Sequence, residues 1–246
     1  MADILDAMSK LQKAHDYFGK AESLYKNINT VRDAAKIDPK DPKQLEKLVG
    51  ITDKETQKLM KALNARAKAT EEAAKAKFPD IPSNTTAKWA QWWKAADKSG
   101  MGSSQEKKAR NAYLKALQAY DLLLRERTTY CDILIKQSGK QIKVYKGLVD
   151  VHKSAEKICL AVIKSPSTTG TAPQATAMKI LLQFRAVPGP ANRIWKAHEK
   201  IIKAAKAEKT KWEKVKKVND VWIKDVQAKN MGDLVKKALA ALGIDA

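Results

Sequence analysis

The sequence predicts an all-α fold, an elongated multi-helix bundle with long amphipathic, coiled-coil-like helices. Only 10 of its 246 residues are glycine and 8 are proline, so long stretches contain no helix breaker. Hydrophobic residues make up 44% of the chain and charged residues 30%, a balance that suits helices with one buried and one solvated face. Large side chains recur every three or four residues, which is the period of such helices.

The N-terminal helical region is predicted to span residues 1–78. From 3 to 36 the larger side chains follow the helical period, and Pro39 stops the pattern. A short helix is expected over 41–50, since Asp41 is followed directly by proline, a pairing typical of an N-cap and first turn.

A third helix of this region is predicted from about 52 to 77. Thr52 and Glu55 have the spacing of a capping box at its start, and Pro79 ends it. Small and apolar residues share one face, which would let a partner helix approach closely. These residues are Leu59, Leu63, Ala67, Thr70 and Ala74.

Residues 79–103 are predicted to form a tryptophan-rich short helix and a linker. Trp89, Trp92 and Trp93 stand at positions i, i+3 and i+4, so one helix face would present all three. This face is interpreted first as a lid that buries its tryptophans on the bundle. A protein-docking face, a membrane-interface helix and a nucleic-acid platform are the alternatives. The SGMGSS segment that follows is expected to be a flexible linker.

The basic helical region, 104–246, is predicted to continue one bundle with the N-terminal helices. It opens with a capping box, Ser103 and Glu106, and stays compatible with helix to about residue 164. One stripe follows a spacing of three and four residues throughout. Its members are Tyr113, Leu117, Tyr120, Leu124, Arg127, Cys131, Leu134, Ser138, Gln141, Tyr145, Leu148, His152, Ala155, Cys159 and Val162.

The stripe turns polar around Gly139, where we expect a kink, a hinge or a helix-to-helix turn. A β-hairpin made of 131–137 and 140–146 is the alternative, because both segments are rich in β-branched residues. Cys131 and Cys159 could form a disulfide only if the chain folded fully back at this point.

Proline and glycine residues between 166 and 173 define a loop, 175–185 a short helix, and VPGP at 187–190 a break. The following 191–229 stretch holds eleven lysines and three tryptophans. Its predicted buried seam consists of Ile194, His198, Ile201, Ala205, Glu208, Trp212, Val215, Asn219, Trp222 and Val226. Lys196, Lys203, Lys217 and Lys224 fall on the opposite side. A last helix is predicted over 232–242.

Three acidic residues of this stretch each precede a lysine by four positions, the favourable order for helical ion pairs. The predicted pairs are Glu199 with Lys203, Glu213 with Lys217, and Asp220 with Lys224.

Positive charge is concentrated in the later part of the chain. The net charge is +21, and residues 81–246 contribute +18 of it, with 32 basic against 14 acidic side chains. Such a field attracts an acidic protein, an anionic membrane surface or nucleic acid. Arg193 is the only arginine of the 191–229 stretch, which disfavours sequence-specific DNA recognition because base reading relies on bidentate arginine.

Candidate chemistry is sparse, so the sequence predicts no enzyme, no cofactor and no metal site. The three histidines, His15, His152 and His198, stand on different predicted helices, and none belongs to an HExxH arrangement. His152 and Cys159 lie seven residues apart, roughly 10 Å along a helix, which is too far for proton transfer between them. Phosphate-binding glycine motifs do not occur.

We therefore expect a lysine-rich, non-enzymatic helical interaction protein whose basic surface engages an anionic partner, foremost an acidic protein. The alternatives are a membrane-acting helical effector or toxin and a nonspecific nucleic-acid-binding protein. A cytoplasmic location is expected, because no signal peptide or transmembrane segment is recognised; secretion without a signal stays open. The candidate partner-binding residues are Trp89, Trp92, Trp93, Lys196, Lys203, Lys214, Lys217 and Lys224.

Overall fold

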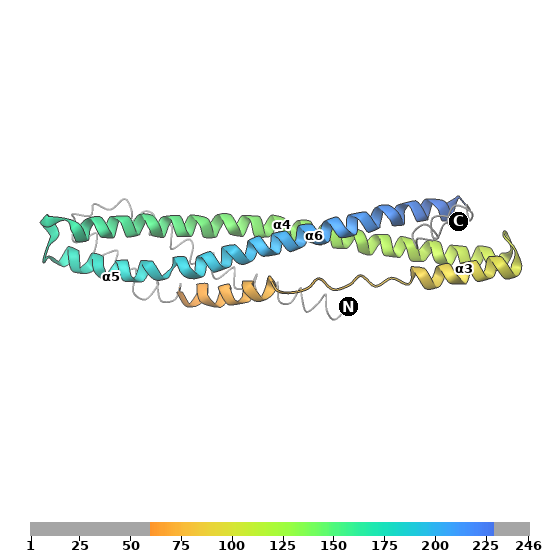
Figure 1. The fold of residues 1–246 in the computed structure, drawn as a ribbon, viewed down its shortest axis with the longest axis horizontal. Coiled ribbons are helices and arrows are strands. Elements are labelled where there is room, and N and C mark those ends of the chain that lie inside the picture. The colour runs from red at the N-terminus through yellow and green to blue at the C-terminus, as the bar shows by residue number, and fades with distance from the viewer. Residues whose placement is uncertain (1–59, 229–246) are drawn as a thin grey trace, which may run out of the picture. The chain divides into compact units, whose positions relative to one another are not determined.

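The structure, a computed structural model, describes residues 60–228 and confirms the all-α bundle (Figure 1). Its helices are 60–73, α3 (Thr85–Ser99), α4 (Ser104–Lys164), α5 (Ala172–Ala186) and α6 (Pro188–Gln227), with the short 3₁₀ helix η1 (Pro166–Thr168) between α4 and α5. The helices predicted over 3–36, 41–50 and 232–242, together with His15 and the capping box at Thr52, lie outside the described residues.

The chain divides into two compact units that do not follow its linear order. Among the described residues, unit 1 comprises 60–77 and Ile135–Lys203, and unit 2 comprises Phe78–Leu134 and 204–228. The first part of α4 and the last part of α6 therefore belong to unit 2, whereas the second part of α4, α5 and the first part of α6 belong to unit 1.

In unit 1, helix 60–73 packs its predicted small-residue face against α4 and α6. Leu63 and Ala67 are buried in one hydrophobic cluster with residues of both longer helices, and the short alanine side chain allows close helix approach. The other buried members are Tyr145, Leu148 and Val149 of α4, Val187, and Ala191 and Ile194 of α6. A second cluster joins the end of α4 to α5 (Figure 1), through Cys159, Val162, Ala177 and Leu181.

In unit 2, α3 packs on the first part of α4 and the last part of α6. Trp92, Tyr113, Leu117 and Val226 form the buried centre of this cluster. The rings of Trp92 and Tyr113 lie 5.7 Å apart between centroids, close enough for a favourable aromatic pair. Trp222 packs against the edge of the same cluster.

The connection between α3 and α4 is a tight turn held by hydrogen bonds, rather than the flexible linker expected from its sequence. Gly100 and Gly102 have φ angles of +78° and +85°, a backbone region that favours glycine. The N–H of Gly100 donates to the carbonyl of Ala96 at 2.9 Å, which closes the end of α3. The two helices thereby form a short hairpin.

Ser103 caps α4 as predicted, because its Oγ accepts the N–H of Glu106 at 3.1 Å. The second half of the predicted capping box is wrong. The carboxylate of Glu106 accepts hydrogen bonds from the Trp92 indole at 2.8 Å and from the Gly102 N–H at 3.2 Å. The Ser103 N–H, which a capping box would satisfy, donates instead to the carbonyl of Gly100 at 3.4 Å.

α4 continues as one helix through Ser138 and Gly139, so the predicted helix-to-helix turn and the alternative hairpin are both wrong. The polar side chains that suggested a break have partners on other helices. Ser138 Oγ lies 3.2 Å from Nδ1 of His198, and Gln141 Oε1 accepts from Arg66 at 3.1 Å. Satisfied polar groups can stay in a buried stripe, and a single helical glycine costs only about 1 kcal/mol relative to alanine.

The predicted α4 stripe is confirmed, since each of its members with a described side chain is buried or half-buried. Arg127 is the charged residue of this stripe, and its buried guanidinium needs charged or polar partners. It donates to Glu208 at 2.9 Å and to the Pro79 carbonyl at 2.6 Å. Its guanidinium also lies 5.8 Å from the Phe78 ring centre. Arg127 of α4 thus holds two elements: the segment before α3, through Pro79, and α6, through Glu208.

The predicted break at 187–190 is confirmed, because α5 ends at Ala186 and α6 begins at Pro188. The single connecting residue, Val187, is fully buried. Pro188 and Pro190 lie in the first turn of α6, where a backbone N–H has no intrahelical acceptor and its absence costs little.

Candidate functional site

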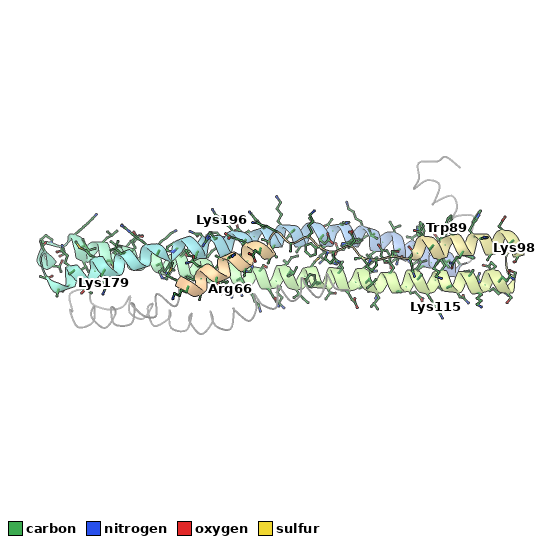
Figure 2. All side chains as sticks on the ribbon, turned by 90° about the horizontal axis from the view of Figure 1, so that it is seen from below. Arg66, Trp89, Lys98, Lys115, Lys179 and Lys196 are labelled. Atoms are coloured by element: carbon green, nitrogen blue, oxygen red, sulfur yellow. The ribbon has the colours of Figure 1, made fainter. Side chains whose placement is uncertain are left out.

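The lysine-rich helix α6 has a buried side and a solvent-exposed side, as its sequence predicts. Each member of the predicted seam is buried or half-buried, whereas Lys196 and Lys203 of unit 1 and Lys214, Lys217 and Lys224 of unit 2 are exposed. Figure 2 shows the side chain of Lys196 directed away from the helices. The tryptophans of the seam therefore hold α6 in place, and these lysines face solvent.

Two further lysines of α6 connect it to α4 by ion pairs. Lys209 lies 2.7 Å from Asp132 of α4, and Lys216 lies 3.3 Å from Asp121 of the same helix. Both lysine pKa values are raised, foremost by hydrogen bonds to carboxylates. Because the two lysines stand seven residues apart, they follow the same side of α6.

Two acidic residues of α6, Glu213 and Asp220, pair with these two lysines, and not with the lysines that follow them. Glu213 lies 3.6 Å from Lys209, and Asp220 lies 2.7 Å from Lys216. The predicted pairs of Glu213 and Asp220 are therefore wrong. Each lysine lies close to a carboxylate on α4 and a second one on its own helix, an arrangement that a helix considered alone does not reveal.

The third predicted pair is also wrong. The carboxylate of Glu199 accepts a hydrogen bond from the Trp195 indole at 2.6 Å. Lys203, its expected partner, is exposed.

Four exposed lysines toward the end of α6, in unit 2, form a surface that we call the basic face. It consists of Lys211, Lys214, Lys217, Val218, Val221 and Lys224, all exposed. None of these four lysines lies within ion-pair distance of a carboxylate in the described part of the chain. Lys211 lies 4.4 Å from the ring centre of Trp212. Uncompensated charge is thus concentrated on one side of α6.

Sequence reasoning missed Lys211, Val218 and Val221 as members of this surface. The signal was present, because the two valines fall on the lysine side of the predicted seam and three residues apart. Apolar residues on the solvated side of an otherwise well-patterned helix are the feature that would have identified them.

The three tryptophans of α3 do not share one surface. Trp92 is 1% exposed, whereas Trp93 is 44% exposed. Trp93 stacks on the half-buried Trp89 with 6.1 Å between ring centroids. The lid interpretation is therefore correct for Trp92, and Trp93 is the tryptophan of α3 that offers a surface for contact.

The polar cluster of unit 1 places a serine beside a histidine. Ser138 is buried, and its Oγ lies 3.2 Å from Nδ1 of His198. Burial, with a smaller contribution from the nearby Arg66 charge, lowers the pKa of His198 to about 4. A catalytic base needs a pKa nearer the working pH. The charged group that acts on His198 is the Arg66 guanidinium, which lowers the pKa, whereas a carboxylate would raise it. The pair therefore has the character of a structural contact.

The cysteines are free and buried. Burial raises the pKa of both the Cys131 and the Cys159 thiol to about 11, so the reactive thiolate is scarce at neutral pH. His152 is buried separately, with Nδ1 2.7 Å from the carbonyl of Leu148.

Residues 60–228 contain neither a candidate metal site nor a candidate membrane-spanning helix. No three side chains of histidine, cysteine, aspartate or glutamate in this range converge in a way that could hold a metal ion. No helix in it combines the length and the apolar character needed to cross a membrane.

Acidification from pH 7 to pH 5 is expected to lower the free energy of unfolding by about 2 kcal/mol through His198. The folded pKa of about 4 lies below the ordinary 6.5, so the unfolded chain binds a proton in this window that the folded chain does not bind. The stability given by the neutral imidazole is complete above pH 6.5 and is lost as the pH falls toward 4.

Urea unfolding of the full chain at several pH values measures this effect. His198→Gln, which cannot titrate, should show a pH dependence about 2 kcal/mol smaller over the same window. Equal pH dependence in the two proteins would contradict the assignment.

Comparison with known proteins adds no relative: no family model matches the chain, and neither curated proteins nor solved structures give a significant match.

Proposed function

We propose that this protein is a non-enzymatic helical binding protein whose exposed α6 lysines engage an anionic partner, specifically an acidic protein. One observation carries the proposal: two sets of lysines near the end of α6 differ in their charge compensation. Lys209 and Lys216 are compensated by carboxylates of α4 and α6. The lysines of the basic face have no such compensation among the described residues.

The lysines without carboxylate partners matter because solubility alone does not require so much positive charge. A net charge of magnitude about 2–8 keeps a small domain soluble, and this chain carries +21. Uncompensated charges on one helix face raise the rate of encounter with an oppositely charged surface. The bundle would supply a rigid support, since α6 is held on its other side by the seam.

An acidic protein fits this face better than nucleic acid does. The exposed groups are lysines, which act as point charges and do not read bases as arginine does. Two valines stand among them, and apolar groups contribute to contacts with a protein surface. A cytoplasmic, reducing compartment suits the two free buried thiols.

A charge-matched pair of variants tests the proposal. The first variant is Lys214→Gln, Lys217→Gln and Lys224→Gln on the basic face. The control is Lys107→Gln, Lys108→Gln and Lys115→Gln, which removes three exposed lysines from α4 in the same unit. Figure 2 shows Lys115 on the outer side of α4. The two variants have the same net charge as each other, because each loses three positive charges.

The tagged full chain would be used to capture partners from a native lysate with and without nuclease. We expect an acidic protein retained after nuclease treatment by the wild type and the control, and about tenfold less of it with the basic-face variant. Tenfold corresponds to about 1.4 kcal/mol, or roughly 0.5 kcal/mol per exposed charge. Retention that depends on nucleic acid, or binding only to anionic vesicles, would contradict the proposal.

A further inference from the structure

The basic face contains an apolar strip at its centre. Val218 is 56% exposed and Val221 is 43% exposed. They stand three residues apart on α6, so their side chains are neighbours on one side of the helix. An isolated exposed apolar residue needs no explanation, but two adjacent ones on the charged side of a helix form a small continuous surface.

The uncompensated lysines surround this strip. Lys214 lies four residues before Val218, Lys217 lies four residues before Val221, and Lys224 lies three residues after it. At these spacings each lysine is a neighbour of a valine on the helix surface. The half-buried Asp225 also stands four residues after Val221, so the apolar centre has three lysines and one carboxylate as its helical neighbours and a positive balance of charge.

We propose that this strip and its lysines form a docking face for an acidic amphipathic helix of a partner protein. The inference rests on the proposed function and adds the form of the partner. Apolar side chains of the docked helix would cover Val218 and Val221, and its flanking carboxylates would lie against Lys214, Lys217 and Lys224.

The dimensions of the face suit a single helix. From Lys211 to Lys224 the rise is roughly 20 Å at 1.5 Å per residue, which equals about four turns of a docked helix. The apolar strip is narrow, and a partner helix can place one ridge of side chains along such a strip. Recognition of an amphipathic helix through regularly spaced apolar anchors is a common mode of peptide binding.

Complementary charge selects the same partner. Glutamate and aspartate at intervals of three or four residues on the docked helix would follow the lysine spacing on α6. A membrane surface would require a much larger apolar area than two valines provide. Phosphate groups of a nucleic acid would use the lysines and leave the valines without a role.

The probe for the test is a synthetic peptide of about 20 residues with leucines at helical spacing and glutamates along both flanks. Its control is a scrambled peptide of identical composition, in which the leucines no longer share one helix face. Binding of each fluorescently labelled peptide to the full chain is measured by anisotropy at two salt concentrations.

The protein variants separate the strip from its surroundings. Val218→Ser with Val221→Ser removes the apolar centre, and serine has a helix propensity close to that of valine. Leu122→Ser with Ile133→Ser is the matched control, because it removes two exposed apolar side chains from α4 in the same unit. The Lys214, Lys217 and Lys224 variant removes the charges.

We expect the helical peptide to bind about tenfold more tightly than the scrambled one, a difference of about 1.4 kcal/mol. The valine variant should abolish this preference, the α4 control should retain it, and the lysine variant should weaken both peptides. Equal binding of the two peptides, or a preference that survives loss of the valines, would overturn the helix inference and leave the proposed function intact. Binding of neither peptide would also overturn it, while lysate capture decides the proposed function separately.

Discussion

Replacing Trp92 with alanine is expected to lower the free energy of unfolding by about 3–5 kcal/mol, the range for truncating a buried tryptophan. The side chain is 1% exposed and lies at the centre of the unit 2 cluster, against Tyr113 and Leu117. Its removal would leave a cavity among residues from three helices. It would also remove the indole donor, 2.8 Å away, from the fully buried carboxylate of Glu106.

Trp93→Ala is the matched control for this prediction. Trp93 is 44% exposed and stacks on the half-buried Trp89, so its loss is expected to cost about 1 kcal/mol or less. Urea unfolding followed by circular dichroism measures both values. Similar losses for the two variants would show that the neighbouring tryptophans do not differ in burial as the structure indicates.

Trp92→Phe separates packing from hydrogen bonding. The phenyl ring keeps most of the contact with Tyr113, but it cannot donate to Glu106. We expect a loss of about 1–3 kcal/mol, the cost of removing one donor from a buried carboxylate, which keeps the Gly102 N–H and has Arg110 at 3.7 Å. A loss as large as that of the alanine variant would assign the whole effect to the hydrogen bond.

The second large effect is expected at Arg127. Methionine at this position would leave Glu208 partly buried without its guanidinium, and breaking a buried pair from one side costs about 3–5 kcal/mol. The Arg127 side chain is 7% exposed and the Glu208 side chain 15%. The same substitution would remove the hydrogen bond to the Pro79 carbonyl, which holds the segment before α3.

Arg125→Met provides the control two residues away. Arg125 also forms an ion pair, at 2.7 Å with Asp121, but its side chain is 64% exposed. Asp121 is buried, but it keeps Lys216 at 3.3 Å when Arg125 is lost, so the loss is expected to stay near the 0.3–0.5 kcal/mol typical of a pair within one helix, at about 1 kcal/mol or less. We therefore expect urea unfolding to show a difference of several kcal/mol between the two arginine variants.

A double variant tests the cause of the Arg127 effect. Adding Glu208→Gln to Arg127→Met removes the unpaired charge and keeps an oxygen that can accept the Trp212 indole hydrogen bond. Part of the lost stability should return, because the two sites are coupled. An additive further loss would show that an unpaired carboxylate is not what destabilises the single variant.

Local sequence determined the helices and their buried stripes. The α4 stripe and the α6 seam follow from side-chain spacing within a few turns, and the break at Val187 follows from nearby prolines. Such signals act over short distances, because the helical period and the missing N–H of proline are properties of adjacent residues. Local pattern failed where a polar residue has a distant partner. Ser138 suggested a break, yet His198, 60 residues away, satisfies it inside an unbroken helix.

The candidate site was only half predictable for the same reason. Sequence pattern placed candidate lysines of α6 outside and the seam tryptophans inside, but it did not show which lysines have carboxylate partners on α4, and it grouped the three tryptophans of α3. Asp132 compensates Lys209 from 77 positions away, and Trp92 differs from Trp93 because its side chain meets Tyr113 and Glu106.

The sequence by itself therefore determined which faces of the helices are apolar or charged. Only the tertiary structure decided which charges are compensated and which aromatic rings are buried. Charge compensation and burial depend on neighbours supplied by other helices, and no local period encodes which neighbours those will be.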